Sequence, residues 1–451
     1  MPDLLPPVTF REEILERVGE LLRAGESCAL VGVSNSGKST IARHLTRADV
    51  RLHYFGARAA QVFVLYLNCK PLAQQPPYAL YVHALEQLIR AAEELDGNFT
   101  PLRPALDDLM LGAQRSPEAL AKRNLDRAIN RVARAGAELI VGVLDDGDEL
   151  LAKAPPALFT DLREVRDNHK RHIVYLTLTR REPATLRRDL PEAKQFTDLI
   201  AAPDHLIPVT PYLEADAFFM VQRLSARQET APLLSYSEKR RLYELSGGHP
   251  GLIRAIYQAV RRNPPTLEIV TAKQLTANAE VDEECSKILK SLEEVEQADL
   301  SRIAARATPT DDGLRRLKRR ELVRVLSVGP QVFSPVFEAY LRLKFGITGA
   351  LTPLEFFDAT HYVRVQDQLI TSLSWPEYIV LRHLYSRRPQ ICRIADLIEV
   401  VRPAEMGKPE ERAVGSSAER LSQYILHIKV KIGPASEHIH REPDGGYRFS
   451  Q

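Results

Sequence analysis

The sequence has four cysteines and a single tryptophan, and it lacks any long apolar run. Cys28, Cys69, Cys285 and Cys392 are far apart and form no Cys-x-x-Cys pair. A disulfide framework or a zinc site is therefore not expected, and this cysteine usage suits a reducing cytoplasm. No apolar stretch approaches the roughly 20 residues that cross a bilayer, so no membrane segment is expected. The N-terminus also lacks the basic-then-apolar layout of a signal peptide.

The chain has almost no net charge. It contains 61 Lys and Arg residues against 59 Asp and Glu residues, which leaves a net charge of +2. That balance argues neither for nor against nucleic acid as a partner. Hydrophobic residues make up 44% and charged residues 27%, the proportions of a soluble globular protein. At 451 residues the chain is too long for one ordinary hydrophobic core, so several folded units are expected.

What the sequence does contain is a phosphate-binding motif between a strand and a helix. Residues 28–31 (CALV) form an apolar run, residues 32–39 read GVSNSGKS, and apolar residues at helical spacing follow. Such a loop points backbone N–H groups at one anion, and its glycines leave room for that anion. Lys38 can reach the β- and γ-phosphates of ATP, and the Ser39 hydroxyl can ligate Mg²⁺. The predicted nucleotide-binding residues of the loop are Gly32, Ser34, Asn35, Ser36, Gly37, Lys38, Ser39 and Thr40.

A second informative stretch is residues 137–150 (AELIVGVLDDGDEL), where an apolar run ends in acidic residues. The run suits a parallel strand that is buried on both faces. Ligands bind at the carboxyl ends of strands in open α/β sheets, which is where Asp145 and Asp146 follow. We assign Asp145 to the metal ion and Asp146 to the attacking water. Asp148 and Glu149 are weaker candidates, and an acidic turn after a core strand is the alternative.

An arginine and a glycine-rich turn are further candidates for the nucleotide site. Residues 172–181 (HIVYLTLTRR) predict another apolar strand, which ends in Thr179 and Arg180. An arginine at this edge of the sheet can sense the γ-phosphate, because its charge is matched there and nowhere else nearby; the alternative is an ordinary surface arginine. Residues 204–262 are expected to be mostly helical, and their LSGGHPGLIRAI segment places Pro250 where a turn can lie over the nucleotide base. A plain connection between two helices is the alternative.

Two later segments raise the question of nucleic acid. Residues 285–345 predict three short helices and a strand–turn–strand, as in a winged helix, and the helix at 311–324 is strongly basic. Its basic residues are Arg315, Arg316, Lys318, Arg319, Arg320 and Arg324. This run can meet DNA or form a solvated helix face, and we favour the solvated face. Residues 361–451 predict a strand hairpin, then helices, then a closing hairpin.

As a set, these motifs resemble the STAND class of P-loop signalling ATPases, which are relatives of AAA+ and origin-recognition ATPases. The resemblance rests on FREEILE near the N-terminus, GVSNSGKS, VLDD, LTLTR and GGHP, and it covers residues 8–345. It implies a nucleotide-binding core, a helical lid and a winged helix, in that order. It also implies that Arg11 lies near adenine, that Arg180 senses the γ-phosphate and that Pro250 contacts the nucleotide.

The last unit, 350–451, resembles the OmpR-type winged-helix DNA-binding domain of bacterial response regulators. The resemblance lies in the opening hairpin, LSWPEYIVLRHL, the helix LSQYILHIKVKIG and the closing IHREPDGGYRF. That family inserts its third helix into the major groove and its wing into a neighbouring minor groove. The groove or phosphate contacts that the resemblance implies are Arg420, Gln423, Tyr424, His427, Lys429, Lys431 and Arg441. The face that it implies to be buried is Ile425, Leu426, Ile428 and Ile432.

The expected fold is an α/β P-loop ATPase core, with helices on both faces of a parallel sheet, followed by a helical lid and two winged-helix domains. The expected boundaries are 1–202 for the core, 203–280 for the lid, 281–346 for the first winged helix and 350–451 for the second. The expected ligands are ATP or ADP with Mg²⁺, and the expected location is the cytoplasm.

Three functions remain open. The first is an ATP/ADP-controlled signalling switch with slow hydrolysis that acts on double-stranded DNA, as a prokaryotic regulator or a defence or stress sensor. Self-association in the ATP state and a separate effector protein are partners that such a switch can have. The second is a DNA-loading ATPase of the origin or transposition type, which the basic run at 311–324 favours. The third is a scaffold whose last winged helix binds a protein, since residues 350–451 carry 13 basic and 13 acidic residues.

Overall fold

The structure is a computed structural model that divides into two compact units, 1–347 and 348–451, each with hydrophobic cores of its own. The residues it describes are 4–95, 97–187, 189–226, 234–262, 267, 270–326, 329–347, 354–365, 368–405, 417–443 and 445–449. The finer division of the first unit into core, lid and winged helix stays a prediction.

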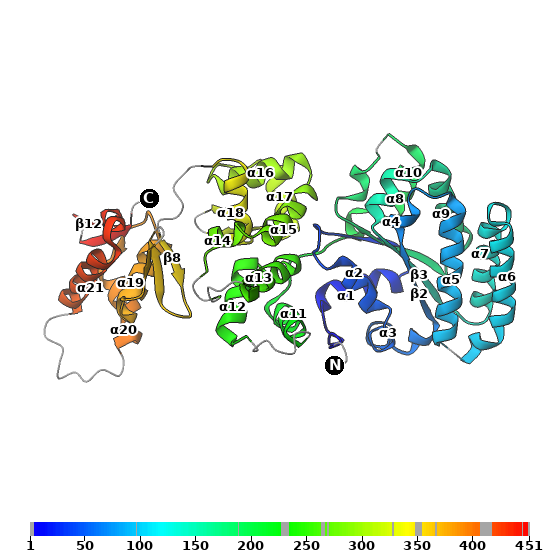
Figure 1. Ribbon diagram of the computed structural model, residues 1–451, viewed down its shortest axis with the longest axis horizontal. Coiled ribbons are helices and arrows are strands. Elements are labelled where there is room, and N and C mark those ends of the chain that lie inside the picture. The colour runs from blue at the N-terminus through cyan, green and yellow to red at the C-terminus, as the bar shows by residue number, and fades with distance from the viewer. Residues whose placement is uncertain are drawn as a thin grey trace. The chain divides into compact units, whose positions relative to one another are not determined.

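The centre of the first unit is a five-stranded parallel sheet with the strand order β2-β3-β4-β1-β5 (Figure 1). Its strands are β1 (Cys28–Val31), β2 (Val62–Asn68), β3 (Leu139–Asp145), β4 (Ile173–Thr179) and β5 (Leu206–Pro208). Every residue of β1, β3 and β4 is buried, because helices cover both faces of the sheet. The apolar runs of the sequence therefore predicted these strands correctly, whereas the short edge strand β5 has no such run.

Successive side chains of the central strands point into opposite helical layers. On β3, Ile140 and Leu144 pack in one layer, and Val141 and Val143 pack in the other. The first layer contains α4 (Cys69–Leu72), α5 (Pro77–Leu95), α6 (Arg103–Arg115), α7 (Pro117–Arg134), α8 (Gly147–Lys153), α9 (Pro156–Asn168) and α10 (Pro191–Ile200). The second layer contains α1 (Glu12–Arg23), α2 (Lys38–Leu45) and α3 (Ala48–Phe55). This is the α/β core that the sequence predicts.

The rest of the first unit is helical and includes one small hairpin. Its elements are α11 (Glu214–Ala226), α12 (Tyr236–Ser246), α13 (Pro250–Arg262), α14 (Ala272–Thr276), α15 (Ala279–Lys290), α16 (Glu294–Ala304), α17 (Asp311–Arg319), β6 (Val323–Leu326), β7 (Gly329–Val332) and α18 (Pro335–Lys344). They share one hydrophobic core, which also takes in Phe10 and Val33 from the nucleotide-binding half. The helices and the hairpin expected at 285–345 are present, although their assignment as a winged helix stays a prediction.

The second unit contains two antiparallel sheets and three helices within its described residues. Its elements are β8 (Leu354–Phe357), β9 (Tyr362–Val365), β10 (Gln368–Ile370), α19 (Trp375–Ser386), β11 (Cys392–Arg393), α20 (Ile394–Glu405), α21 (Ser417–Ile432), β12 (Ile439–Glu442) and β13 (Gly446–Phe449). The first residues of the expected domain, 350–353, lie outside the described residues. The OmpR-type assignment of this unit stays a prediction.

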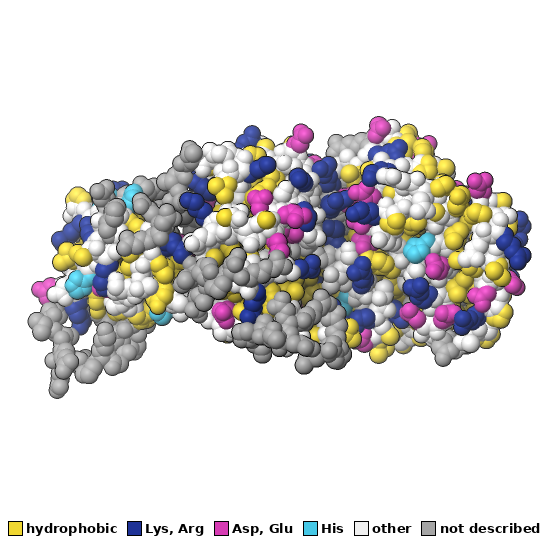
Figure 2. Space-filling view, viewed as in Figure 1, with side chains coloured by type: hydrophobic (Ala, Val, Ile, Leu, Met, Phe, Trp, Pro, Cys, Tyr) yellow, Lys and Arg dark blue, Asp and Glu magenta, His cyan; other side chains and the backbone are white. Residues whose placement is uncertain are grey.

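The surface carries charges of both signs. On the face drawn in Figure 2, basic and acidic side chains are interspersed over the described part of the chain. No helix among the described residues has the length and apolar character that a membrane span requires.

Candidate functional site

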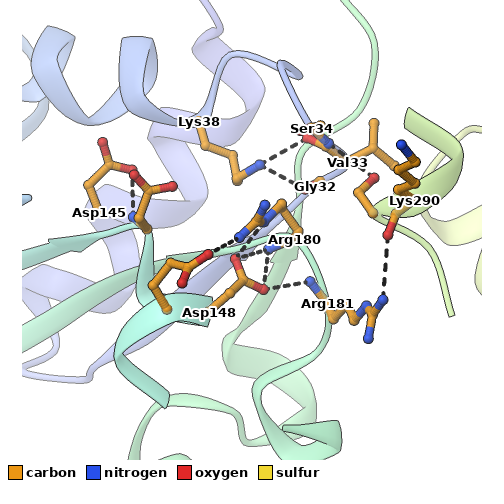
Figure 3. Close-up of polar contacts among 12 residues, drawn as sticks. Gly32, Val33, Ser34, Lys38, Asp145, Asp148, Arg180, Arg181 and Lys290 are labelled. Atoms are coloured by element: carbon orange, nitrogen blue, oxygen red, sulfur yellow. Dashed lines mark hydrogen bonds and ion pairs between the residues drawn. The ribbon is translucent and has the colours of Figure 1, made fainter. Parts of the chain in front are cut away.

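The phosphate loop, residues 32–37, lies at the carboxyl end of β1 and leads directly into α2. Gly37 has a φ of +96°, and a Cβ there would lie 2.9 Å from a neighbouring tyrosine hydroxyl, so the position requires glycine. Lys38 opens α2, and its ammonium donates to the carbonyl oxygens of Gly32 and Val33 at 2.8 and 2.9 Å (Figure 3). The Lys38 side chain therefore folds back and binds the first two residues of the phosphate loop.

A cavity of about 250 Å³ opens beside the phosphate loop. Ser34 to Thr40 line it, together with Asp145, Asp146 and Arg180. The structure thus brings together the loop, the acidic turn and the arginine that the sequence places far apart. Pro250 of the glycine-rich turn also lines the cavity, as expected for a residue that contacts the nucleotide.

One loop hydroxyl is buried in this cavity wall without a partner. Ser36 is 2% exposed, and its Oγ has no hydrogen-bond partner in the part of the chain that the structure describes. Leaving a buried polar group unpaired costs about 1–3 kcal/mol. A phosphate oxygen bound in the loop would accept from this hydroxyl, so the loop fits an anionic ligand.

Ser39 and Asp145, the residues expected to hold the metal, face each other at the end of β3. Ser39 Oγ donates to Asp145 Oδ1 at 3.0 Å, and the Tyr66 hydroxyl donates to the other carboxylate oxygen. One hydroxyl and one carboxylate suit Mg²⁺, which keeps waters and takes phosphate oxygens as further ligands. Among the described residues, no group of three or more His, Cys, Asp or Glu side chains could hold a metal ion.

Asp146 also lines the cavity, and its backbone N–H donates to Asp145 Oδ1 at 2.9 Å. It is half-buried, adopts a left-handed conformation with φ 54°, and directly precedes α8. Burial, together with the neighbouring Asp145 carboxylate, raises the pKa of Asp146. A carboxylate with a raised pKa is a stronger base, which suits the expected role of orienting and deprotonating water.

Arg180 lines the cavity, but its charge is already matched. Its Nε donates to Asp148 and its Nη2 donates to Glu149, both at 3.2 Å, and its backbone N–H donates to Asp148 at 2.8 Å (Figure 3). The expectation that only a γ-phosphate could match this charge is wrong, because two carboxylates at the start of α8 do so. Sensing a γ-phosphate would require Arg180 to exchange these partners.

Arg11 does not itself line the cavity, and its expected place near the base stays a prediction. Its buried guanidinium donates to the carbonyl oxygens of Pro211 and Thr210 at 2.9 and 2.6 Å, and it lies 5.0 Å from the centre of the Tyr212 ring. The arginine therefore fixes the segment that leads into α11. Its neighbour Phe10 lines the cavity instead.

The rest of the cavity wall was not predicted. Phe10, Tyr212, Phe219 and Met220 form an apolar side that suits a nucleobase. Arg254, on α13, adds an exposed guanidinium that makes no hydrogen bond or ion pair within the described residues, and a guanidinium suits phosphate. Most of these residues reach the cavity through the packing of α11 and α13 on the core, for which no local motif exists.

The second unit uses two of its expected DNA contacts internally. Lys431 donates to Glu377 at 2.6 Å, and His427 Nδ1 lies 3.2 Å from the same carboxyl group. Glu377 is buried and also caps α19, so both partners are held against the fold. Of the other expected contacts, Gln423 and Arg441 are exposed; Arg420, Tyr424 and Lys429 are partly buried.

The exposed residues of α21 are mixed in character and include two large apolar side chains. Leu426 is 60% exposed and Val430 is 75% exposed. The expectation that Leu426 is buried is wrong, because Ile425, Ile428 and Ile432 repeat at helical spacing and form the buried face without it.

The basic run at 311–324 is largely used inside the first unit. Arg316 pairs with Glu293, Arg319 pairs with Glu182, and Arg320 pairs with Glu296. Arg315, Lys318, Arg319 and Arg324 are exposed, as the favoured alternative of a solvated helix face predicts, but Arg316, Arg319 and Arg320 also make the pairs just described. They hold helices and loops of the first unit together.

The binding of a nucleotide is expected to weaken at high pH. Burial lowers the pKa of Lys38 to about 8. A bound phosphate favours the ammonium form, so binding takes up a proton above that pH and affinity falls as pH rises. We expect ADP to bind about tenfold more weakly at about pH 9 than at about pH 7. Calorimetry in two buffers of different ionisation enthalpy measures both the affinity and the proton uptake, and an absence of uptake near pH 8.5 would contradict this prediction.

Comparisons with known proteins agree with this geometry. Residues 7–174 match the family model described as AAA ATPase domain. A comparison with curated proteins finds no match. The chain therefore carries an AAA ATPase domain and is an ATPase.

Three solved structures are similar to the chain at low identity. The Walker-type ATPase PABY2304 of Pyrococcus abyssi has 17% identity and a TM-score of 0.45, over 76% of this chain and 100% of that one. The Orc1 protein of Aeropyrum pernix, in complex with DNA, has 14% identity and a TM-score of 0.37, over 99% of this chain and 89% of that one. A RuvB mutant of Thermotoga maritima has 12% identity and a TM-score of 0.31, over 74% of this chain and 94% of that one.

Proposed function

We propose that this protein is a nucleotide-controlled switch, in which slow ATP hydrolysis in the core decides how the following segments are held. Lys38 and the phosphate loop bind ATP or ADP, and Asp146 orients the attacking water. Ser39 and Asp145 would hold Mg²⁺, which supplies positive charge to the phosphate oxygens when it is bound. The apolar wall around Phe10 takes the base.

The observation that carries the proposal is a set of contacts on the segment after β4, residues 180–182. The Arg320 guanidinium donates to the carbonyl oxygen of Arg180, and Arg319 pairs with Glu182. Arg181 Nη2 donates to the carbonyl oxygen of Lys290 at 3.4 Å (Figure 3). One short segment therefore lines the nucleotide cavity with one side chain and contacts α15 and the end of α17 with its other groups.

A γ-phosphate can act on this segment through Arg180. The γ-phosphate competes with Asp148 and Glu149 for the Arg180 guanidinium. If Arg180 moves toward the phosphate, residues 180–182 shift, and their hydrogen bonds and ion pair with α15 and the end of α17 are strained. ADP has no γ-phosphate and leaves these pairs in place. A ligand shifts a conformational equilibrium only through a difference in affinity for the two states, and Arg180 supplies that difference between ATP and ADP.

The output of the switch is double-stranded DNA, bound by the second unit in the ATP state. Exposed Gln423 and Arg441 support this output. A scaffold that binds a protein partner is the second candidate, and exposed Leu426 and Val430 favour it. A DNA-loading ATPase loses its main support, since four of the six basic residues of the run at 311–324 are paired with carboxylates of the first unit.

The proposal is tested by the affinity of the full chain for labelled duplex fragments, measured by fluorescence anisotropy with ADP and with a non-hydrolysable ATP analogue. We expect about tenfold tighter binding with the analogue, which corresponds to a coupling free energy of about 1.4 kcal/mol. By linkage, duplex DNA must then raise the affinity for the analogue, relative to the affinity for ADP, by the same factor.

A matched pair of variants on α17 separates the switch from general effects of charge. Arg319→Ala removes the pair with Glu182 and is expected to raise duplex affinity in ADP about threefold, the scale of an exposed ion pair. Arg315→Ala removes an exposed arginine from the same helix and should have no effect. The switch is contradicted if the wild type binds duplex DNA equally tightly with ADP and with the ATP analogue, and if Arg319→Ala leaves duplex affinity in ADP unchanged. The scaffold is favoured by two results together. The full chain does not bind duplex DNA at low salt, and its self-association or its binding to a protein partner depends on the nucleotide.

A further inference from the structure

The phosphate loop is held from outside by residues that lie more than 200 positions later in the chain. Asn35 Nδ2 donates to both carboxylate oxygens of Glu284, at 3.0 and 2.9 Å. The Ser34 backbone N–H donates to Ser291 Oγ at 3.1 Å, and His249 Nε2 lies 3.0 Å from the Ser34 carbonyl oxygen. Ser34 is on the side of the loop that faces the end of α15, where Lys290 lies (Figure 3).

Asn35 needs this support because of its backbone conformation. Its φ is 56°, in the left-handed region, which asparagine adopts more readily than other residues with a Cβ but less readily than glycine. Such a conformation persists only where the surroundings determine it. Two hydrogen bonds to a carboxylate are charge-assisted and therefore stronger than neutral ones. Glu284 therefore stabilises the left-handed conformation of Asn35, and through it the turn of the phosphate loop.

The surroundings of Glu284 are shaped for this contact. Its side chain is 7% exposed, and a Cβ on Gly251, the second residue of α13, would collide with its Oε1. The first turn of α13 can therefore accommodate the carboxylate only because glycine stands there. Burial raises the pKa of Glu284, and the amide of Asn35 opposes that shift by stabilising the charged form.

His249 fixes the neighbouring peptide group in the same way. The backbone N–H of Leu252 donates to His249 Nδ1 at 3.2 Å, so Nε2 carries the proton and donates to the Ser34 carbonyl oxygen. The ring is buried, and burial lowers its pKa to about 3, which keeps it neutral. Both polar groups of the Ser34 backbone are therefore already paired within the protein, which leaves the N–H groups that follow free to bind a phosphate.

We infer that Glu284 is a positioning residue for the phosphate loop, and that α15 thereby decides whether the loop holds its nucleotide-binding shape. When α15 is docked, Asn35 stays left-handed and the loop is ready for phosphate. When α15 moves away, Asn35 loses both acceptors, the loop relaxes and the nucleotide is released. The inference rests on the proposed function, because it assumes that this loop binds ADP and ATP, and it names the contact through which the later helices control the site.

The test is the affinity of the full chain for ADP, measured by calorimetry. Glu284→Ala is expected to weaken ADP binding about tenfold. Glu284→Gln keeps one acceptor for Asn35 and is expected to recover affinity to within about threefold of the wild type. Glu283→Ala removes the adjacent, exposed carboxylate of the same helix and should leave binding unchanged.

A second background separates positioning from a general loss of stability. Glycine adopts a positive φ without help, so in an Asn35→Gly background Glu284→Ala should cost no further affinity. If it still costs tenfold there, Glu284 acts through stability and the inference is overturned. The inference is also overturned if Glu284→Ala binds ADP as tightly as the wild type. If Glu284→Ala does not fold, the same comparison is made with Glu284→Gln, whose smaller loss must vanish in the Asn35→Gly background. Failure of the wild type to bind ADP would instead contradict the proposed function.

Discussion

Lys38→Ala is expected to weaken ADP and ATP binding at least a hundredfold, or by about 3 kcal/mol. The lysine is the partly buried cation of the phosphate loop, while Asp145, Asp146 and Asp148 line the same cavity. Without the ammonium, a phosphate group in the loop faces these carboxylates with one positive charge fewer to offset them. Calorimetry on the full chain measures the loss directly.

The same substitution should not unfold the protein. Burial lowers the pKa of Lys38, which means that the folded state carries this charge at a cost near neutral pH. Removing the charge relieves that cost, although it also gives up two hydrogen bonds to loop carbonyls. We therefore expect the melting temperature to stay within a few degrees of the wild type. Arg43→Ala, on the exposed side of the same helix, is the control and should change affinity less than about threefold. Tight ADP binding by a folded Lys38→Ala variant would show that the nucleotide does not bind in this loop.

The parts of the site that could be predicted are those whose signal is local. Lys38 and Ser39 follow a strand and open a helix within one short stretch, so the spacing alone places them at the end of β1. Asp145 and Asp146 follow a fully apolar run, and parallel sheets bring the carboxyl ends of such strands to one edge. The fold class and the ATPase domain were confirmed for this reason.

The errors concern residues whose partners lie far away in the sequence. Arg180 was expected to be unmatched, yet Asp148 lies 32 residues before it and binds its backbone and side chain. The contact between Asn35 and Glu284 spans 249 residues, and no motif relates the two. A resemblance transfers the role of a residue, but the charges around that residue depend on how this chain packs.

The second unit shows the same limit on one helix. The spacing of its isoleucines places the buried face of α21, whereas the resemblance also implied that Leu426 belongs to that face, and this residue is exposed. The position of a residue along a helix decides which way its side chain points. An apolar residue that does not fall on the buried face is therefore exposed, even though it is apolar. The DNA contacts proposed for this helix remain predictions, and the exposed leucine and valine are the features that a protein partner would use.

Asp146→Asn is expected to keep ATP binding within about threefold of the wild type and to lower the hydrolysis rate at least a hundredfold. Asp146 lines the cavity but does not hydrogen-bond to Ser39, whereas Asp145 does. An amide retains the shape of the side chain and cannot accept a proton from water. Phosphate release in single-turnover experiments, alongside the Kd for ATP, separates the two steps.

The pH dependence of hydrolysis gives the matching signature. Burial raises the pKa of Asp146, and only its deprotonated form accepts a proton, so the rate of the wild type should rise as pH increases through that pKa. The variant should lose this rising limb together with its activity. Asp145→Asn, in contrast, should raise the Mg²⁺ concentration needed for ATP binding, since it removes the carboxylate beside Ser39. If instead Asp146→Asn changes the Mg²⁺ requirement and Asp145→Asn abolishes turnover with binding intact, the two carboxylates have the opposite roles.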